Sequence, residues 1–278
     1  FPIKADAKEF MLELLDQLKD ERPFEISSWL KRCKDWKSKY PIVLPEYKEC
    51  KDAVNSFYFI QVLSEKLDEK AVIITDMGTS FTCTMQTFKT KLGQRLSTSS
   101  GHASMGFGLP GAIGACIGNN RKDTICISGD GGLQMNIQEL QTIVHYNLPV
   151  KLFVLNNNGY LTIKATQQNH FGRFVGAEKS SGVTCPDIIK IATAYGLPNI
   201  RIANTEELNL KIDSVLQATG PMVCEIIMEE NQPLIPRVSS LKKPDGTIIS
   251  KPIEDLYPFL SREEFQENMI VDPTEILT

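Results

Sequence analysis

The chain has 278 residues, of which 42% are hydrophobic and 23% are charged, as in ordinary globular proteins. A net charge of −4 without long runs of one sign argues against a nucleic-acid partner and against a polybasic membrane surface. No apolar stretch is long enough to span a bilayer, so no membrane partner is expected either.

The seven cysteines are widely spaced and include no CxxC pair. This pattern predicts neither a disulfide framework nor a zinc site, and it favours a reducing, cytoplasmic location. The chain begins FPIKAD, without a methionine, and we therefore expect it to be part of a longer protein.

The first fifty residues predict two helices and a linker. Asp6 has the position of an N-cap for the first helix, and residues 27–40 predict a second helix with Ser27 or Ser28 as its cap. Residues 41–50 carry two prolines and read as an extended linker, so we place a domain boundary there.

From about residue 52 onward, predicted helices alternate with short apolar strands. The predicted strands are 71–75, 123–128, 150–156 and 222–228. The predicted helices are 55–67, 106–118, 133–146, 185–196 and 206–219. This alternation predicts an α/β fold in which a parallel sheet is flanked by helices on both faces.

The expected organisation has three parts. Residues 1–50 form a first part that ends in the linker, residues 51–230 form the α/β domain, and residues 231–278 form a C-terminal extension. The extension is rich in proline and turn residues and is expected to wrap the domain as an ordered tail. The segment 167–174, QQNHFGRF, reads as a polar loop.

Three predicted strands end in loops that carry glycine and oxygen-bearing side chains. These loops are 76–80 (DMGTS), 129–132 (GDGG) and 156–159 (NNNG). Ligands of open parallel sheets bind beyond the carboxyl ends of the strands. Strands 123–128 and 150–156 flank one helix, so their ends are expected to bring Asp130 and Asn157 close enough to share an ion.

The residue types at these strand ends predict a metal-bridged diphosphate. A carboxylate and an amide oxygen, with a backbone carbonyl at Gly159, are hard donors that suit Mg²⁺. One carboxylate alone binds Mg²⁺ weakly, and such sites are completed by phosphate oxygens. Gly131 and Gly132 let backbone N–H groups approach an anion at the start of the following helix.

The GDGG and LNNNGY segments resemble the paired signature of thiamine diphosphate-dependent enzymes. The segments GHASMGFGLPGAIGA and LQMNIQEL are similar to the acetolactate synthase-like branch of that family. The resemblance covers about residues 50–230, and more weakly 1–50, which resembles the end of the family's middle domain. It implies the thiamine diphosphate-binding fold, with thiamine diphosphate and Mg²⁺ as cofactors.

The resemblance also implies roles for particular residues. Asp130, Asn157 and the carbonyl of Gly159 would hold Mg²⁺. Met105 would support the bent conformation of the cofactor, and the carbonyl of Ala103 would accept a hydrogen bond from its amine. The position of His102 beside these two residues favours a substrate contact, and the alternative is a histidine that bonds only within its own loop. The remaining residues expected to face the cofactor are Gly78, Thr79, Ser80, Gly131, Gly132 and Tyr160.

The implied function is that of a 2-oxo acid decarboxylating carboligase, acetolactate synthase-like, of which this chain is the C-terminal cofactor-binding part. In this family the activating glutamate lies in an N-terminal pyrimidine-binding domain that is not in this chain, so the chain alone is expected to be inactive. The cofactor lies between subunits, which implies a homodimer or tetramer acting on a small 2-oxo acid.

Other interpretations stay open at this point. Simple pyruvate decarboxylases carry a glutamate where this chain has Ile163 or Lys164, and acetolactate synthases carry a tryptophan at the position of Thr166. The GHAS segment is similar to decarboxylases of phosphonopyruvate and sulfopyruvate, so a non-ligating decarboxylase is one alternative. A non-catalytic binding module of the same fold is another. A GxGxxG match at residues 106–111 is a weaker indication of a dinucleotide site, because residues 97–105 are a poor preceding strand.

Overall fold

The computed structural model describes residues 1–20, 25–242 and 245–271 of the chain, which divides into two compact units, 1–41 and 42–278. The first unit contains α1 (Ala7–Gln17) and α2 (Ser27–Lys39). Asp6 caps α1 as predicted, because its carboxylate accepts hydrogen bonds from the N–H groups of Lys8 and Glu9. The predicted serine cap of α2 is wrong: Ile26 precedes the helix and offers no side-chain cap.

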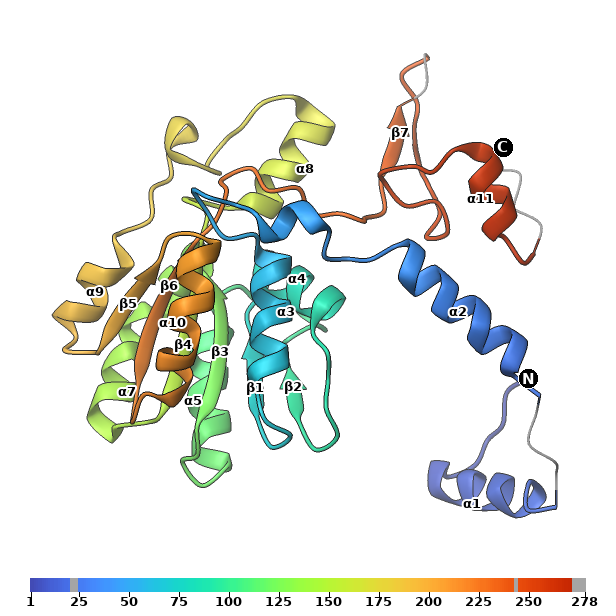
Figure 1. Cartoon of the computed structure of the whole chain (residues 1–278), viewed down its shortest axis with the longest axis horizontal. Helices are drawn as coiled ribbons and strands as arrows, with labels where there is room; N and C mark the ends of the chain where they lie inside the picture. The colour runs from blue at the N-terminus through green and yellow to red at the C-terminus, as the bar shows by residue number, and fades with distance from the viewer. Residues whose placement is uncertain (21–24, 243–244, 272–278) are drawn as a thin grey trace. The chain divides into compact units, whose positions relative to one another are not determined.

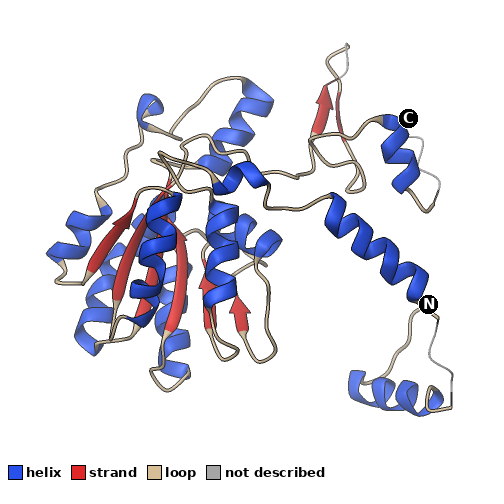
Figure 2. Cartoon of the chain, in the orientation of Figure 1, coloured by secondary structure: helices blue, strands red, loops and turns tan. Residues whose placement is uncertain are grey.

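The second unit is built on a six-stranded parallel sheet in the order β2-β1-β3-β4-β6-β5 (Figures 1 and 2). Its strands are β1 (Val72–Thr75), β2 (Arg95–Ser97), β3 (Thr124–Gly129), β4 (Val150–Asn156), β5 (Asn199–Ile202) and β6 (Met222–Ile227). The predicted α/β fold with a parallel sheet is therefore confirmed, and β2 and β5 are strands that the sequence pattern did not reveal.

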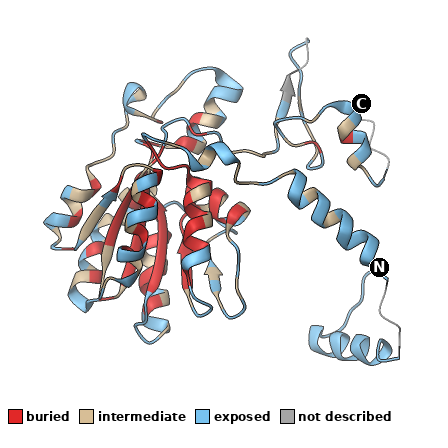
Figure 3. Ribbon diagram, viewed as in Figure 1, coloured by how far each residue is buried: buried red, intermediate tan, exposed pale blue. Residues whose placement is uncertain are grey.

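Two buried clusters cover the two faces of this sheet. Side chains alternate along each strand, so Ile73 and Phe153 face one cluster while Ile74 and Leu152 face the other. The first cluster takes its helical residues from α3 (Ser56–Lys66), α4 (Thr79–Thr87) and α10 (Thr205–Gln217). The second takes them from α5 (Gly108–Gly118), α6 (Asp130–Leu133), α7 (Leu140–Tyr146) and α9 (Ile188–Ala194). Figure 3 shows the buried residues concentrated on the strands and the helix faces that cover them.

The glycine-rich segment of the predicted dinucleotide motif serves helix packing. A Cβ on Gly111 would lie 3.1 Å from Cγ2 of Ile74 on β1 and 2.9 Å from the Phe107 ring. Glycine at this position lets α5 approach the sheet closely, and no strand of the structure runs through residues 98–107.

Two predicted segments differ from the structure. The expected continuous helix 133–146 is divided into α6, the 3-10 helix η2 (Gln134–Glu139) and α7, because Asn136 leaves helical geometry. The expected polar loop 167–174 is in large part helical, since α8 (Leu161–Phe171) runs through it. Gln167 fixes the end of this helix by a pair of hydrogen bonds with the backbone of Val175.

The C-terminal extension is ordered, as expected, in its described part. It holds the antiparallel pair β7 (Ser240–Lys242) and β8 (Ile248–Ser250), followed by α11 (Arg262–Asn268). Gln232 anchors its start, because both ends of its side-chain amide hydrogen-bond to Ser56. The remaining 3-10 helices are η1 (Pro45–Lys48), which lies in the predicted linker, and η3 (Lys179–Ser181). The three-part division 1–50, 51–230 and 231–278 stays a prediction of sequence organisation.

Over the ranges that the structure describes, none of the helices has the length and apolar character needed to cross a bilayer.

Candidate functional site

The three polar loops predicted at the strand ends lie at one edge of the sheet. β1, β3 and β4 are parallel neighbours, with Thr75 paired to Ile127 and Gly129 paired to Leu155. The loops that leave these strands therefore begin side by side, at the carboxyl edge where parallel sheets bind ligands.

Asp130 is the charged group that joins two of these loops. Its side chain is buried, with 1% of its surface exposed. One carboxylate oxygen accepts a hydrogen bond from the Gly131 N–H (2.9 Å), and the other accepts one from the Gly159 N–H (3.0 Å). Burial raises the pKa of Asp130 to about 6, and these backbone N–H groups offset only part of that effect. The aspartate of the GDGG loop is thus held directly against the NNNG loop.

The three consecutive asparagines of the NNNG loop have different surroundings. Asn156 donates to Glu225 (2.6 Å) and Asn158 donates to Glu230 (2.6 Å). Asn157 lies between them with 5% of its surface exposed, yet among the described residues its side chain has no hydrogen-bond partner. Of the three asparagines, Asn157 is the one whose side chain is not held by a glutamate, which suits a ligand role.

The donors around Asp130 fit Mg²⁺. A carboxylate, an amide oxygen and the Gly159 carbonyl are hard oxygen ligands, and phosphate oxygens and water complete such sites. In the described residues no group of three or more His, Cys, Asp or Glu side chains could hold a metal ion. Gly159 has φ +153°, and a Cβ there would lie 2.4 Å from the Ala177 carbonyl, so this position requires glycine.

The glycines after Asp130 are tightly packed. A Cβ on Gly131 would lie 2.2 Å from the ring of Tyr160, and a Cβ on Gly132 would lie 2.8 Å from a carboxylate oxygen of Asp76. Their predicted contact with a diphosphate stays a prediction. The structure adds a second reason for glycine here, because these two side chains fill the space that a Cβ would need.

The loop after β1 leads into the N-terminus of α4. Gly78 has φ +74° and immediately precedes the helix, whose first turn contains Thr79 and Ser80. The first N–H groups of a helix lack helical partners and favour an anion. Both side chains are buried, and the Ser80 hydroxyl donates to the Met77 carbonyl (3.0 Å), so backbone N–H groups are the diphosphate donors that this loop offers.

The segment with His102, Ala103 and Met105 forms an exposed loop before α5. All residues from 101 to 105 are exposed, and Met105 has 37% of its surface accessible. Ala103 has φ +55°, an uncommon conformation for alanine, and its N–H donates to the Ser99 carbonyl (2.7 Å). The predicted roles of these residues stay predictions, and their exposure leaves them free to contact a ligand or a second domain.

Two residues beside the site were not predicted. Asp76 is 1% exposed and accepts hydrogen bonds from Met77, Gly106 and Ser128, and its position directly after an apolar strand is a signal that was not used in the prediction. Cys185 lies close to Asp130, and burial together with that carboxylate raises the pKa of its thiol to about 12. A hollow of about 830 Å³ opens beside Asn158 and Cys185, next to the buried aspartate.

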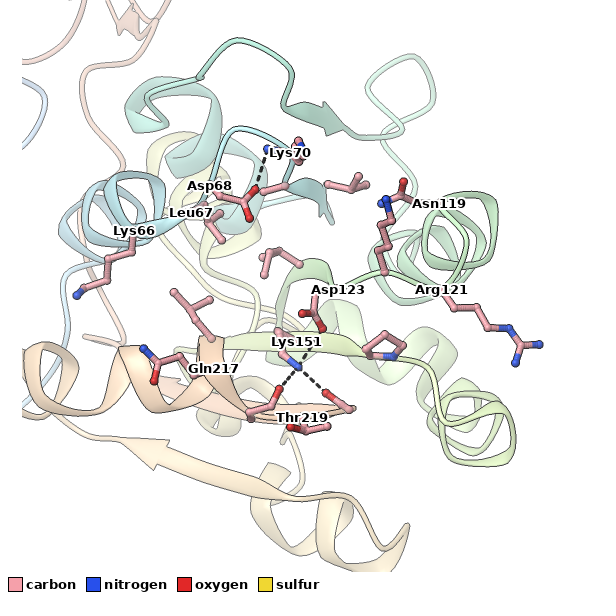
Figure 4. Close-up of a pocket in the computed structure, with 18 of the residues that line it drawn as sticks. Lys66, Leu67, Asp68, Lys70, Asn119, Arg121, Asp123, Lys151, Gln217 and Thr219 are labelled. Carbon is pink, nitrogen blue, oxygen red and sulfur yellow. Dashed lines mark hydrogen bonds and ion pairs between the residues drawn. The ribbon is translucent and has the colours of Figure 1, made fainter.

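A second hollow, of about 1000 Å³, lies at the opposite, amino edge of the sheet (Figure 4). Its notable group is Lys151, which is fully buried on β4. The ammonium donates to the carbonyls of Ala218 (2.6 Å) and Gly220 (2.5 Å) and pairs with Asp123 at 3.3 Å. Two carbonyls accept from the ammonium and a carboxylate balances its charge, so this lysine has a structural role.

The sequence profile of the family "thiamine pyrophosphate enzyme, C-terminal TPP binding domain" matches residues 76–226, more than half of the chain. The chain belongs to this family. Thiamine pyrophosphate is the same compound as thiamine diphosphate, so the comparison agrees with the cofactor and the fold implied by the sequence motifs.

Acetolactate synthases are among the relatives of this thiamine pyrophosphate-binding domain. The chain is 34% identical over 255 residues to the acetolactate synthase large subunit of Pyropia yezoensis, which covers 90% of the chain and 42% of the relative. It is 32% identical over 244 residues to that of Cyanidium caldarium, with coverages of 85% and 40%. It is also 32% identical over 247 residues to acetolactate synthase 2, chloroplastic, of Zea mays, with coverages of 86% and 38%. The chain thus spans about two fifths of the length of these relatives.

Proposed function

We propose that the complete protein containing this chain is a thiamine diphosphate- and Mg²⁺-dependent carboligase that decarboxylates a small 2-oxo acid. The observation that carries the proposal is the hydrogen bond between the Gly159 N–H and the buried Asp130 carboxylate. It joins the two signature loops at the carboxyl edge, where Asp130 and Asn157 would hold Mg²⁺ with the Gly159 carbonyl. The acetolactate synthase relatives support the reaction type.

In this proposal the chain's own residues bind and orient the cofactor. The backbone N–H groups around Gly78 and Gly131 would face the diphosphate, and Met105 and Ala103 would contact the rings. Bound thiamine diphosphate would supply the carbon nucleophile and the electron sink that decarboxylation of a 2-oxo acid requires. The activating glutamate would come from a pyrimidine-binding domain outside this chain, in a homodimer or tetramer.

A non-ligating decarboxylase is the second candidate, and features of α8 favour keeping it. Thr166 stands where acetolactate synthases carry tryptophan, and its small side chain hydrogen-bonds back to the Thr162 carbonyl (3.0 Å). Lys164 is buried and paired with Glu178 at 2.6 Å, so it does not replace the decarboxylase glutamate. Neither substrate marker is therefore present on this helix.

Incubating the complete protein with thiamine diphosphate, Mg²⁺ and pyruvate tests the proposal. The carboligase predicts CO₂ release together with a coupled product in which two carbon skeletons are joined. Free aldehyde as the sole organic product would favour the decarboxylase. Cofactor binding without CO₂ release from any 2-oxo acid would favour a non-catalytic module.

We also propose a reducing compartment for the protein, and its support is that all seven cysteines are free thiols. The cytoplasm predicted from the sequence is one such compartment, and the plastid named for the maize relative is another.

A further inference from the structure

Asp76 connects the loop after β1, the segment before α5 and the end of β3 through one buried carboxylate. One of its oxygens accepts hydrogen bonds from the N–H groups of Met77 (2.8 Å) and Gly106 (2.9 Å). The other accepts the hydroxyl hydrogen of Ser128 (2.8 Å), at the end of β3. A single side chain therefore joins the Gly78 loop, the loop that contains Met105, and the loop of Asp130.

Asn136 holds the same glycine from the opposite side. Its side-chain amide donates to the Gly106 carbonyl at 2.9 Å. To make this contact Asn136 adopts φ −139° and ψ 31°, which interrupts the helix that the sequence pattern predicts through this segment. The Gly106 residue is thus bound through its N–H by Asp76 and through its carbonyl by Asn136, an arrangement we name the Gly106 clamp.

Glycines make the Gly106 clamp possible. Gly106 has φ +85°, and a Cβ there would lie 2.5 Å from Cβ of Met135 and 3.0 Å from the Asn136 amide nitrogen. A Cβ on Gly108 would lie 2.8 Å from Cβ of Asp76, which is closer than packed carbon atoms approach. Two glycines of the GFGLP segment are therefore accounted for by contacts of the clamp, independently of any ligand.

We infer that Asp76 and Asn136 are positioning residues that set the place of the thiamine-ring loop, 101–105, relative to the metal and diphosphate loops. The loop itself is exposed along its length, so surrounding side chains do not bury it. Gly106 directly follows Met105, and fixing the Gly106 peptide fixes the point from which the Met105 side chain emerges. This inference rests on the proposed function, because it assigns the loop to the cofactor rings.

Variants of the Gly106 clamp should affect the binding of thiamine diphosphate and of inorganic diphosphate differently. Of these loops, Asn136 supports the thiamine-ring loop, whereas Asp76 also supports the loops of Gly78 and Asp130. In the complete protein with saturating Mg²⁺, Asn136→Ala is expected to lower the affinity for thiamine diphosphate about tenfold, the effect of one lost hydrogen bond. The same substitution should change the affinity for inorganic diphosphate by no more than about twofold, because that ligand lacks the thiamine rings. Asp76→Ala should weaken both ligands.

Conservative variants separate positioning from general damage. Asp76→Asn keeps an oxygen that accepts from both backbone N–H groups, and the Ser128 hydroxyl can turn to accept from the amide, so both affinities should stay within about threefold. Asn136→Asp keeps the shape but removes the donor, and it should behave like Asn136→Ala. Gln141→Ala, on the exposed side of α7, is the matched control and should change neither affinity.

Isothermal titration calorimetry with both ligands, together with thermal melting of each variant, decides the outcome. The inference is overturned if Asn136→Ala weakens both ligands equally or weakens neither. It is also overturned if Asp76→Asn loses as much affinity as Asp76→Ala. If the unaltered protein binds neither ligand with Mg²⁺, the proposed function itself fails. Should Asp76→Ala not fold, the Asn136 variants and Asp76→Asn still decide the question.

Discussion

Each of the two edges of the central sheet contains a buried charged side chain, but the two side chains have different partners. At the amino edge, Lys151 donates to two carbonyls and is paired with the carboxylate of Asp123. At the carboxyl edge, Asp130 receives backbone N–H groups but no cationic side chain is paired with it among the described residues, and its pKa is raised to about 6. Beside it, no hydrogen bond holds the Asn157 side chain in the same described ranges, whereas Asn156 and Asn158 each donate to a glutamate.

This contrast favours a structural role for Lys151 and a ligand-binding role for Asp130. The amino edge contains the larger of these two hollows, whereas the candidate site lies at the carboxyl edge. The carboxyl edge is the candidate because Asp130 has no paired cation among the described residues, and a bound metal ion would supply one. Asp255 gives a second comparison: it is as buried as Asp130, but hydrogen bonds from Arg262, with Lys251 nearby, lower its pKa.

The largest expected effect comes from Asp130→Ala. Loss of the buried carboxylate should cost roughly 3 kcal/mol or more of cofactor binding with Mg²⁺, which is a hundredfold or greater loss of affinity. Asp123→Ala is a matched control, since Asp123 precedes β3 and Asp130 follows it, and affinity should be unchanged there. Calorimetry of the complete protein with thiamine diphosphate measures both. Equal affinity in the Asp130 variant would contradict the metal assignment.

Lys151→Met should lower the stability of the fold but leave cofactor affinity unchanged, in contrast to Asp130→Ala. The change leaves the Ala218 and Gly220 carbonyls buried without a donor, at a cost of about 2–5 kcal/mol in the free energy of unfolding. Affinity for thiamine diphosphate in the variant that remains folded should not change, because Lys151 lies at the other edge of the sheet. Denaturant unfolding and calorimetry test the two halves of this prediction. A selective loss of cofactor affinity would show that the amino edge takes part in binding.

The smallest expected effect is that of Asp255→Asn, which should lower the free energy of unfolding by about 1 kcal/mol. The effect is small because Arg262 is partly exposed and solvent screens its pairing with Asp255. Pairing lowers the folded-state pKa of Asp255 below its ordinary value of about 4, so its stabilisation is present above pH 4. That stabilisation is lost as the pH falls through the folded-state pKa. Urea unfolding at pH 7 and at decreasing pH below 4 should therefore show a difference from the unaltered protein that shrinks as the pH falls. A difference independent of pH would exclude the ion pair as its cause.

The sequence was sufficient to predict the sheet and the meeting of Asp130 with the NNNG loop. Long apolar runs identified β3 and β4, and parallel neighbours necessarily bring their carboxyl ends together. It did not show which of the three asparagines would lack a partner, because that depends on Glu225 and Glu230, which lie some 70 residues further along the chain.

The elements that escaped prediction are those fixed by distant contacts. Asn136 breaks a helix because its amide bonds to Gly106, thirty residues earlier, and this contact overrides local helical preference. Helix α8 has no clear apolar stripe, and the Lys164–Glu178 pair and the bonds of Gln167 to Val175 hold it in place. Neither contact has a signature in local sequence periodicity.

The most direct test is a crystal structure of the complete protein with thiamine diphosphate and Mn²⁺ in place of Mg²⁺, using the anomalous signal of manganese to locate the ion. We expect one Mn²⁺ at about 2.1–2.3 Å from the Asp130 carboxylate, the Asn157 amide oxygen and the Gly159 carbonyl, bridged to the diphosphate. Manganese bound elsewhere, or diphosphate bound without contact to the Asp130 and Asn157 loops, would contradict it.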